Sequence, residues 1–271
     1  MPIREGKVIV ILLAMLFSLV AYAGAYEDGA SAYEQKNYSA AMAKFKLAAA
    51  RNHGGAQHHL GLMYGNGEGV VQDYAEAIKW FKLAATQGDA RAQYNLGFMY
   101  GKGEGVVRDY VESVKWYRLA AAQGVANAQY NLGVRYENGQ GVVQDYVEAV
   151  KWFKLAAVQG HANAQYNLGN MYRNGQGVVQ DYSEAIKWYR LATEQGHERA
   201  QTNLGVMYGI GQGVVQDDVR AFMWLNLAAE SGISNALKGR DIVAEKMTAQ
   251  QIVEAQKLAR ECRARNYKNC D

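Results

Sequence analysis

The sequence predicts an all-α protein in which helix-loop-helix units stack side by side as a solenoid. Five tryptophans recur at a constant spacing of 36 residues, and a Leu-Gly pair recurs at the same spacing. Units of this length are too small to bury a helix face alone, so they stack on their neighbours. The chain has one proline, Pro2, and none interrupts a helix after it. The tryptophans are Trp80, Trp116, Trp152, Trp188 and Trp224.

The N-terminal segment has the features of a signal peptide. Arg4 and Lys7 precede an apolar stretch over residues 8–20, which is short for a membrane-spanning helix. Small residues then predict cleavage after Ala23, with Ala25 as the competing site. We therefore expect residues 1–23 to be a signal peptide. A membrane anchor that is retained is the alternative.

The body of the chain is expected to contain a partial repeat over residues 24–54 and five full repeats over residues 55–232. In one unit, Ala92, Leu96 and Tyr100 follow helical spacing and predict the buried face of a first helix. A glycine loop follows, and its two valines are expected to return to the core. These are Val106 and Val107 in the same unit.

The second helix of each unit begins with a capping signal. Asp109 stands three residues before Glu112, which predicts an acidic capping box, and the same pair recurs in three other units. The fifth unit has Arg220 three residues after Asp217, so its cap is expected to be weaker. An apolar face then follows, and Gly124 is placed to end the helix.

Residues 233–271 are expected to form C-terminal capping helices and a tail. Residues 234–246 predict one helix, and residues 248–265 predict a second that begins at Thr248 with Gln251 three residues on. Cys262 and Cys270 are the two cysteines of the chain. In an exported protein they are candidates for a disulfide, and two free thiols are the alternative.

The motif Ala-Gln-Tyr-Asn-Leu-Gly-x-x-Tyr, followed by Gly-x-Gly-Val-Val-x-Asp-Tyr and Trp-Tyr-x-Leu-Ala-Ala, closely resembles the Sel-1-like repeat. This family is related to the tetratricopeptide repeat and has a longer loop between the two helices. The resemblance implies a right-handed α/α superhelix whose first helices line the concave surface. It also implies a role as an adaptor, scaffold or regulator.

Several other chemistries fit the residues poorly. A net charge of +3 argues against a nucleic-acid partner. The repeated glycines match turn chemistry better than phosphate binding. The paired acids are explained by helix capping rather than by acid–base catalysis. The histidines lack metal-site spacing, and His58 and His59 are interpreted as surface substitutions. We therefore expect no enzymatic activity, no cofactor and no metal.

A variable stripe on the first helices is the candidate partner-binding surface. It lies opposite Leu96 on a helical wheel and combines aromatic, apolar and amide side chains, which suits a peptide or partner helix. The alternative is that its tyrosines pack against the adjacent unit. The stripe comprises Tyr94, Phe98, Lys102, Tyr130, Val134, Asn138, Tyr166, Asn170 and Asn174.

These observations predict an exported scaffold, adaptor or regulator that binds a protein or peptide in the periplasm or outside the cell. The protein is expected to be monomeric and not inserted in the membrane after signal cleavage. One alternative is a cysteine-poor relative of secreted β-lactam-binding or β-lactam-hydrolysing Sel-1-like repeat proteins. The absence of cysteines from the repeats argues against it. A passive structural spacer is the other alternative.

Overall fold

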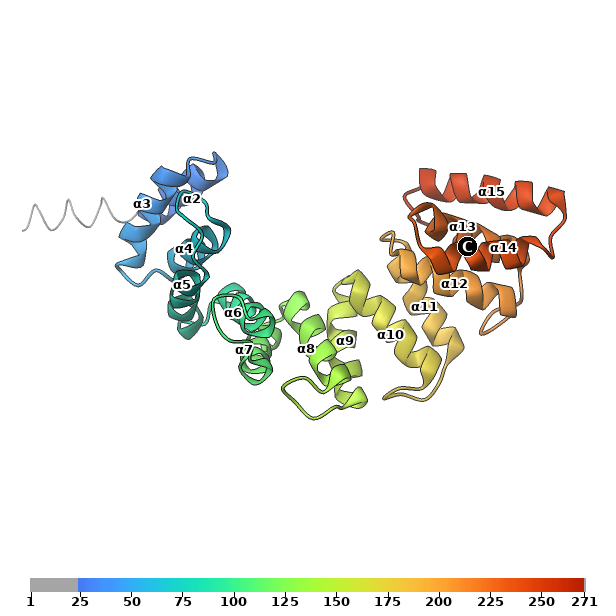
Figure 1. The fold of residues 1–271 in the computed structure, drawn as a ribbon, viewed down its shortest axis with the longest axis horizontal. Coiled ribbons are helices and arrows are strands. Elements are labelled where there is room, and N and C mark those ends of the chain that lie inside the picture. The colour runs from blue at the N-terminus through green and yellow to red at the C-terminus, as the bar shows by residue number, and fades with distance from the viewer. Residues whose placement is uncertain (1–23, 271) are drawn as a thin grey trace, which may run out of the picture. The chain divides into compact units, whose positions relative to one another are not determined.

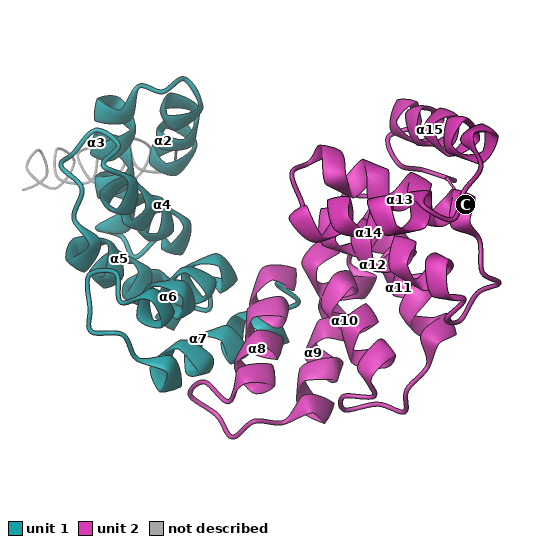
Figure 2. Cartoon of the chain, turned by 45° about the vertical axis from the view of Figure 1, so that its right-hand side comes forward, with its two compact units in different colours: residues 1–125 teal, residues 126–271 magenta. Residues whose placement is uncertain are grey.

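The computed structural model describes residues 24–270, and this part of the chain consists of fourteen helices joined by turns and loops, without strands. The all-α repeat fold is therefore confirmed. The predicted signal peptide lies outside the described residues, and the handedness of the superhelix stays a prediction. The helices divide into two compact units, residues 1–125 and residues 126–271, shown in separate colours in Figure 2.

Unit 1 contains the N-terminal helix pair and the first two repeats. In Figure 1 its helices follow one another from blue to green. They are α2 (Ala25–Glu34), α3 (Tyr38–Ala49), α4 (Gly54–Asn66), α5 (Tyr74–Thr86), α6 (Ala90–Lys102) and α7 (Tyr110–Ala122).

Unit 2 contains three repeats and the C-terminal helices. Its even-numbered helices are the first helices of each pair, and they pack mainly on the odd-numbered helices beside them. They are α8 (Ala126–Asn138), α9 (Tyr146–Val158), α10 (Ala162–Asn174), α11 (Tyr182–Thr193), α12 (Glu198–Ile210), α13 (Asp218–Glu230), α14 (Ser234–Ala244) and α15 (Ala249–Ala264).

Each repeat is held together by close packing of its two helices around the recurrent Leu-Gly pair. Leu96 is fully buried, as are its equivalents in the other four repeats. A Cβ atom added at Gly97 would lie 2.5 Å from the Tyr117 ring of α7, so only glycine allows the two helices to approach this closely. Ala92 and Met99 complete the buried face of α6, as its apolar periodicity predicts.

The prediction that both loop valines return to the core is wrong. Val106 is half-buried and packs against the core of its unit, whereas Val107 is 90% exposed. The two residues lie in a segment without helical hydrogen bonds, and adjacent side chains of extended backbone point in opposite directions. The same exposure recurs at Val71, Val143, Val179 and Val215.

Only half of the predicted capping box is present at the second helices. The Asp109 side chain accepts a hydrogen bond from the Glu112 amide at 3.0 Å, but the Asp109 amide donates to the Tyr100 carbonyl instead. Glu112 pairs with Lys115 at 2.8 Å. Asp217 caps α13 in the same way, through the Arg220 amide. The fifth cap was expected to be weaker because Arg220 cannot accept a hydrogen bond from the Asp217 amide. That expectation does not hold, because the glutamates of the other caps do not accept this hydrogen bond either.

Buried glutamines connect successive helices within each unit. Gln93 is 4% exposed, and its side-chain amide donates to the Ala85 carbonyl at the end of α5 at 3.1 Å. Its oxygen accepts from Gln123, just after α7, at 2.8 Å. One amide thus joins three helices, and unit 2 repeats the arrangement with Gln165, Ala157 and Gln195. Satisfied buried amides of this kind fix the register of the stack.

The N-terminal residues form a complete helix pair, α2 and α3, which contributes to the core next to α4. The interpretation of His58 and His59 as surface residues is wrong, because His58 packs on Phe81 of α5 and His59 packs on this N-terminal pair. His58 is 5% exposed, and the His59 ring stacks on Phe45 of α3 with 4.7 Å between ring centroids. Burial lowers the pKa of His58 to about 4. The two histidines are uncharged packing residues.

The C-terminal helices agree closely with the sequence interpretation. Thr248 caps α15 with a full capping box, in which the Gln251 side-chain oxygen accepts a hydrogen bond from the Thr248 amide. The structure joins Cys262 at the end of α15 to Cys270 by a disulfide, with 5.2 Å between the Cα atoms. Cys262 is 1% exposed and belongs to the core around α12 and α13. The disulfide therefore ties the last residues of the chain back to that core.

Candidate partner-binding groove

The predicted stripe in unit 1 combines one supporting residue with two exposed ones. Tyr94 is half-buried, and its ring lies 5.9 Å from that of Tyr117. Phe98 is 36% exposed, and the Lys102 Nζ atom lies 5.9 Å from the centroid of its ring. Phe98 also lines a small cleft of about 170 Å³. The two residues offer an apolar and cationic patch, whereas Tyr94 mainly supports the helix pair.

In unit 2, the stripe tyrosines contact the next first helix. The Tyr130 ring stacks on His161, the N-cap of α10, with 4.5 Å between centroids. The Tyr166 ring stacks on His197, the N-cap of α12, with 4.6 Å between centroids. Both histidine rings accept the capping hydrogen bond through Nδ1, at 3.2 Å. The tyrosines therefore fix the start of the next helix while remaining half-buried.

The amides of the stripe are engaged within the unit. Asn170 Oδ1 accepts hydrogen bonds from the Tyr189 hydroxyl at 2.7 Å and from Asn203 Nδ2 at 3.0 Å. Asn138 is exposed and donates to the carbonyl of half-buried Val134 on its own helix. Asn174 is exposed and accepts from Arg173. The structure does not bring these four stripe residues together into one hollow.

Two adjoining hollows in unit 2 form a groove across its first helices. One, of about 320 Å³, is lined by Tyr130 of α8, by residues of α10, and by the start of α12. The other, of about 500 Å³, shares Tyr166 and Arg199 and extends to the start of α14. We call this the asparagine groove and define it by Tyr130, Asn163, Tyr166, Asn167, Arg199, Asn203 and Asn235.

The asparagine groove combines amide, phenol and guanidinium groups. His197 Nε2 lies 3.0 Å from Asn163 Oδ1, and it is the donor, because Nδ1 accepts the capping bond. Burial lowers the pKa of both His161 and His197, which favours their neutral form. Arg199 is exposed and brings the positive charge of the groove, beside Glu198. The groove can therefore donate and accept hydrogen bonds along its length.

The stripe prediction included Tyr130 and Tyr166 but missed the polar residues of the groove. These residues belong to two further rows with the 36-residue period. One row has asparagine in four of the five repeats, Asn95, Asn131, Asn167 and Asn203, and His59 in the first. The other varies, with Arg91, Asn127, Asn163, Arg199 and Asn235. An amide kept in four repeats outside the apolar face was the available signal. The row also joins neighbouring helices, since Asn203 Nδ2 donates to Asn170 Oδ1.

Five consecutive matches to the Sel1 repeat model cover residues 55–89, 90–125, 126–161, 162–197 and 198–233. The chain belongs to the Sel1 repeat family. Proteins built from Sel1 repeats generally mediate protein–protein interactions. The boundaries of the matches coincide with the helix pairs, so each Sel1 repeat supplies one first helix and one second helix.

Two solved structures resemble this Sel1 repeat protein over most of its length. One is c5321, a protective antigen of uropathogenic Escherichia coli strains, with 38% identity, 92% of this chain covered and a TM-score of 0.80. This chain spans 55% of the length of c5321. The other is a Sel1 repeat protein from Oxalobacter formigenes, with 35% identity, 80% of this chain and 86% of that chain covered, and a TM-score of 0.73. No curated protein matches the chain significantly.

The residues that the structure describes contain no cluster of three or more His, Cys, Asp or Glu side chains arranged to hold a metal ion. None of their helices combines the length and apolar character that crossing a membrane requires. The predicted acid pairs, such as Asp73 with Glu76, are accounted for by a cap at 2.9 Å and an ion pair with Lys79.

Proposed function

We propose that this protein is an exported, non-enzymatic interaction module whose asparagine groove holds an extended segment of a protein partner. The observation that carries the proposal is the pair of adjoining hollows across α8, α10, α12 and α14. Asparagine side chains recur along them at the spacing of the repeats. A rigid scaffold that presents regularly spaced side chains is suited to a long, regular ligand such as a polypeptide.

The groove chemistry matches a peptide backbone. An asparagine amide carries both a donor and an acceptor, so it can pair with the C=O and N–H groups of an extended chain. Asn167 and Asn235 stand at successive steps of the groove. The half-buried rings of Tyr130 and Tyr166 give flat apolar contacts with a polar tip. Arg199 favours a partner segment with an acidic side chain near the centre.

In-cell photocrosslinking tests the groove directly. A benzophenone amino acid placed at position 167 or 235 should crosslink to a specific partner. The matched controls are Asn138 and Asn174, exposed asparagines of the same unit that lie outside the groove. Stronger crosslinking at the control positions would contradict the groove assignment. A passive spacer predicts no specific crosslink from any of the four.

Affinity for the captured partner then tests the chemistry. The double variant N167A/N235A should weaken binding about tenfold or more, since each lost hydrogen bond costs about 1 kcal/mol. The control N138A/N174A should bind as the wild type does. The purified protein should not hydrolyse nitrocefin, and clear turnover would favour the β-lactam-hydrolysing alternative.

Of the two predicted cleavage sites, we propose that an exported chain is cut after Ala23, because Gly24 and Ala25 belong to the folded part of the chain. Gly24 is the N-cap residue of α2, and its carbonyl accepts from the Asp28 amide at 2.8 Å. Ala25 is fully buried against the first core. Cleavage after Ala25 would remove both residues. The intact mass of the protein recovered from the periplasm or medium should match a chain that begins at Gly24, and the full-length mass would contradict cleavage.

A further inference from the structure

Two charged side chains on the first helices of unit 2, Arg199 and Glu137, are available for contact with a partner. Arg199 lies in the first turn of α12, is exposed and lines both hollows of the asparagine groove. Glu137 lies next to the last residue of α8 and is half-buried. Among the residues that the structure describes, neither side chain has a hydrogen-bond or ion-pair partner.

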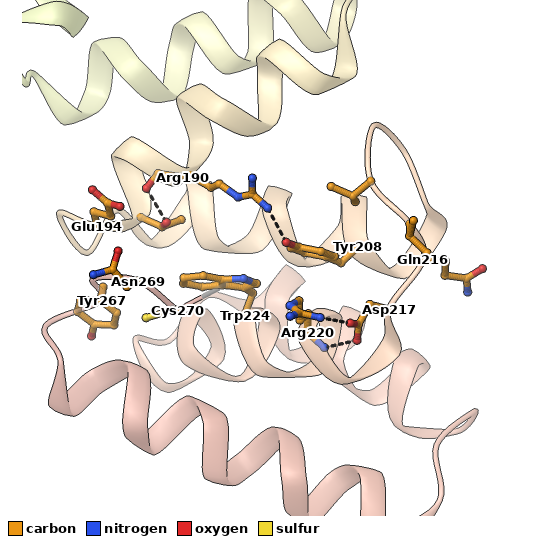
Figure 3. A pocket seen from close by; sticks show the side chains of 13 residues that line it. Arg190, Glu194, Tyr208, Gln216, Asp217, Arg220, Trp224, Tyr267, Asn269 and Cys270 are labelled. Carbon is orange, nitrogen blue, oxygen red and sulfur yellow. Dashed lines mark hydrogen bonds and ion pairs between the residues drawn. The ribbon is translucent and has the colours of Figure 1, made fainter.

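The arginines of a further hollow, of about 670 Å³, show the difference. This hollow lies between α11, α13 and the C-terminal segment, and Figure 3 shows its labelled side chains. The Arg190 guanidinium donates to the Tyr208 hydroxyl at 2.8 Å, and Arg220 forms an ion pair with Asp217. These two guanidinium groups are engaged within the chain, whereas that of Arg199 is not. Arg199 is therefore the better candidate for binding an acidic group from outside.

Glu137 is on the same face of α8 as Tyr130, which lines the groove. The two residues are seven positions apart, which is about two helical turns, or about 10 Å along the helix axis. Half-buried Val134 lies between them on that face. Burial raises the pKa of Tyr130, Glu137 raises it further, and Arg199 opposes the increase. The charges of Glu137 and Arg199 are thus both close to the Tyr130 hydroxyl.

The carboxylate of Glu137 is particular to the third repeat. The other repeats have Gly65, Gly101, Arg173 and Gly209 at this position, so the stack does not require an acid there. Burial raises the pKa of Glu137, and no cation in the described part of the chain offsets this effect. Its oxygens still reach the surface, because they lack partners and yet are not among the buried polar atoms without one. A cation from outside would stabilise a carboxylate in this environment.

We propose that the segment held in the asparagine groove carries two opposite charges, a basic side chain that pairs with Glu137 and an acidic side chain that pairs with Arg199. The inference rests on the proposed function and specifies its ligand, an extended segment of another protein with mixed charge. A lysine or arginine of the partner supplies the cation that Glu137 lacks. A partner carboxylate can form two parallel hydrogen bonds with the Arg199 guanidinium. Because the two contacts lie on different helices, they also fix the direction of the segment.

A segment with charges of one sign fits this surface less well. Glu198 lines the hollow of about 320 Å³ beside Arg199, and together with Glu137 it repels a segment that carries several acidic side chains. Arg199 repels a segment whose only charges are basic. One acidic and one basic side chain is therefore the pattern that matches these three charges.

Selection from a phage-displayed library of random dodecapeptides on the purified protein tests the charge pattern. Peptides enriched on the wild type should contain both acidic and basic residues in excess of the unselected library. Selection on E137Q should lose the excess of basic residues and keep that of acidic residues, and selection on R199Q should show the reverse. The control variants E245Q and K246Q change exposed charges at the end of α14 that line neither hollow, and they should select the same peptides as the wild type.

Fluorescence polarisation with one enriched peptide then measures each contact. E137Q should weaken binding about tenfold or more, because a charge-assisted hydrogen bond is lost. The same peptide with glutamine in place of its basic residue should bind E137Q and the wild type equally. R199Q should give the corresponding result with the peptide that lacks its acidic residue. Circular dichroism checks that both variants keep their helices, and the thermal midpoint of E137Q should not fall, since an unpaired carboxylate is removed.

The inference is overturned if the enriched peptides show no excess of either charge, if they are uniformly acidic or basic, or if E137Q and R199Q select the same peptides as the wild type. The variant N167A/N235A separates this result from the groove itself. Peptides that lose binding in N167A/N235A but do not respond to E137Q or R199Q would leave the groove in place and refute the charge pairing. Peptides that bind N167A/N235A as well as the wild type, or a library without enrichment on the wild type, would contradict both proposals.

Discussion

The contact between neighbouring repeats can be tested at the two loop glycines Gly103 and Gly105. Both have left-handed backbone, with φ values of 80° and 72°. A Cβ atom at Gly105 would lie 2.6 Å from the carbonyl carbon of Tyr74, in the first turn of α5 in the preceding repeat. A Cβ atom at Gly103 would lie 3.2 Å from the Cβ atom of Arg108 in its own loop. Only the substitution at Gly105 therefore pushes two repeats apart.

The expected costs follow from these distances. Forcing alanine into the left-handed region costs about 1–2 kcal/mol in either variant. Overpacking against backbone adds about 1–3 kcal/mol in G105A alone. The free energy of unfolding should therefore fall by about 2–5 kcal/mol in G105A and by about 1–2 kcal/mol in G103A.

Urea unfolding followed by circular dichroism measures the two losses, and hydrogen exchange should show faster opening of α5 and α6 in G105A. Equal losses in the two variants would refute the reasoning. Gly105 would then be required only for its backbone angle, and the loop would not brace the preceding repeat.

Two further predictions concern pH and the disulfide. Burial lowers the pKa of His58 to about 4 and also lowers the pKa of His197. The contribution of both groups to stability is therefore complete above about pH 6.5, the unfolded pKa of histidine, and is lost progressively as the pH falls toward the folded pKa values. The shift at His58 corresponds to an unfolding free energy on the order of 3 kcal/mol, so the urea midpoint should decrease as the pH is lowered from about 7 to about 4. A urea midpoint that does not change over this range would contradict the conclusion that His58 is buried in its neutral form. H197N keeps a capping side chain and should reduce that pH dependence. The variant C262S/C270S should lose about 2–3 kcal/mol of unfolding free energy. If a reductant leaves the thermal midpoint of the wild type unchanged, the disulfide does not stabilise the fold and this prediction is wrong.

Most of the fold could be predicted because the same buried residues recur in every repeat. Residues that recur every 36 positions, such as Leu96 and Gly97, face equivalent neighbours in each repeat. One helical wheel therefore applies to all five repeats. The side-chain caps at Asp109 and Thr248 could be predicted because they depend on residues three positions apart. The reciprocal bond of a capping box formed only at Thr248, because the Asp109 amide donates to the Tyr100 carbonyl.

The candidate site was harder to predict because a first helix is contacted on more than one side. A wheel centred on Leu96 places Tyr94 opposite the core, yet in unit 2 the equivalent Tyr130 packs on both Phe153 and His161. The wheel considers one helix and its own partner, and it omits the helix of the next repeat. The same omission made His58 look exposed, because its ring packs on Phe81 and lies beside Asn95 of the next repeat. His59 looked exposed because α2 and α3 could not be recognised as a full pair from their degenerate spacing.

The glutamine bridges have a consequence for how such a chain changes length. Gln93 and Gln165 make equivalent junctions with residues at identical repeat positions, so the surfaces that meet at these junctions are interchangeable. Duplication or deletion of one 36-residue unit would recreate the same junction on both sides of the change. Recombination can therefore lengthen or shorten the array without redesigning its interior, while the two dissimilar ends remain as they are.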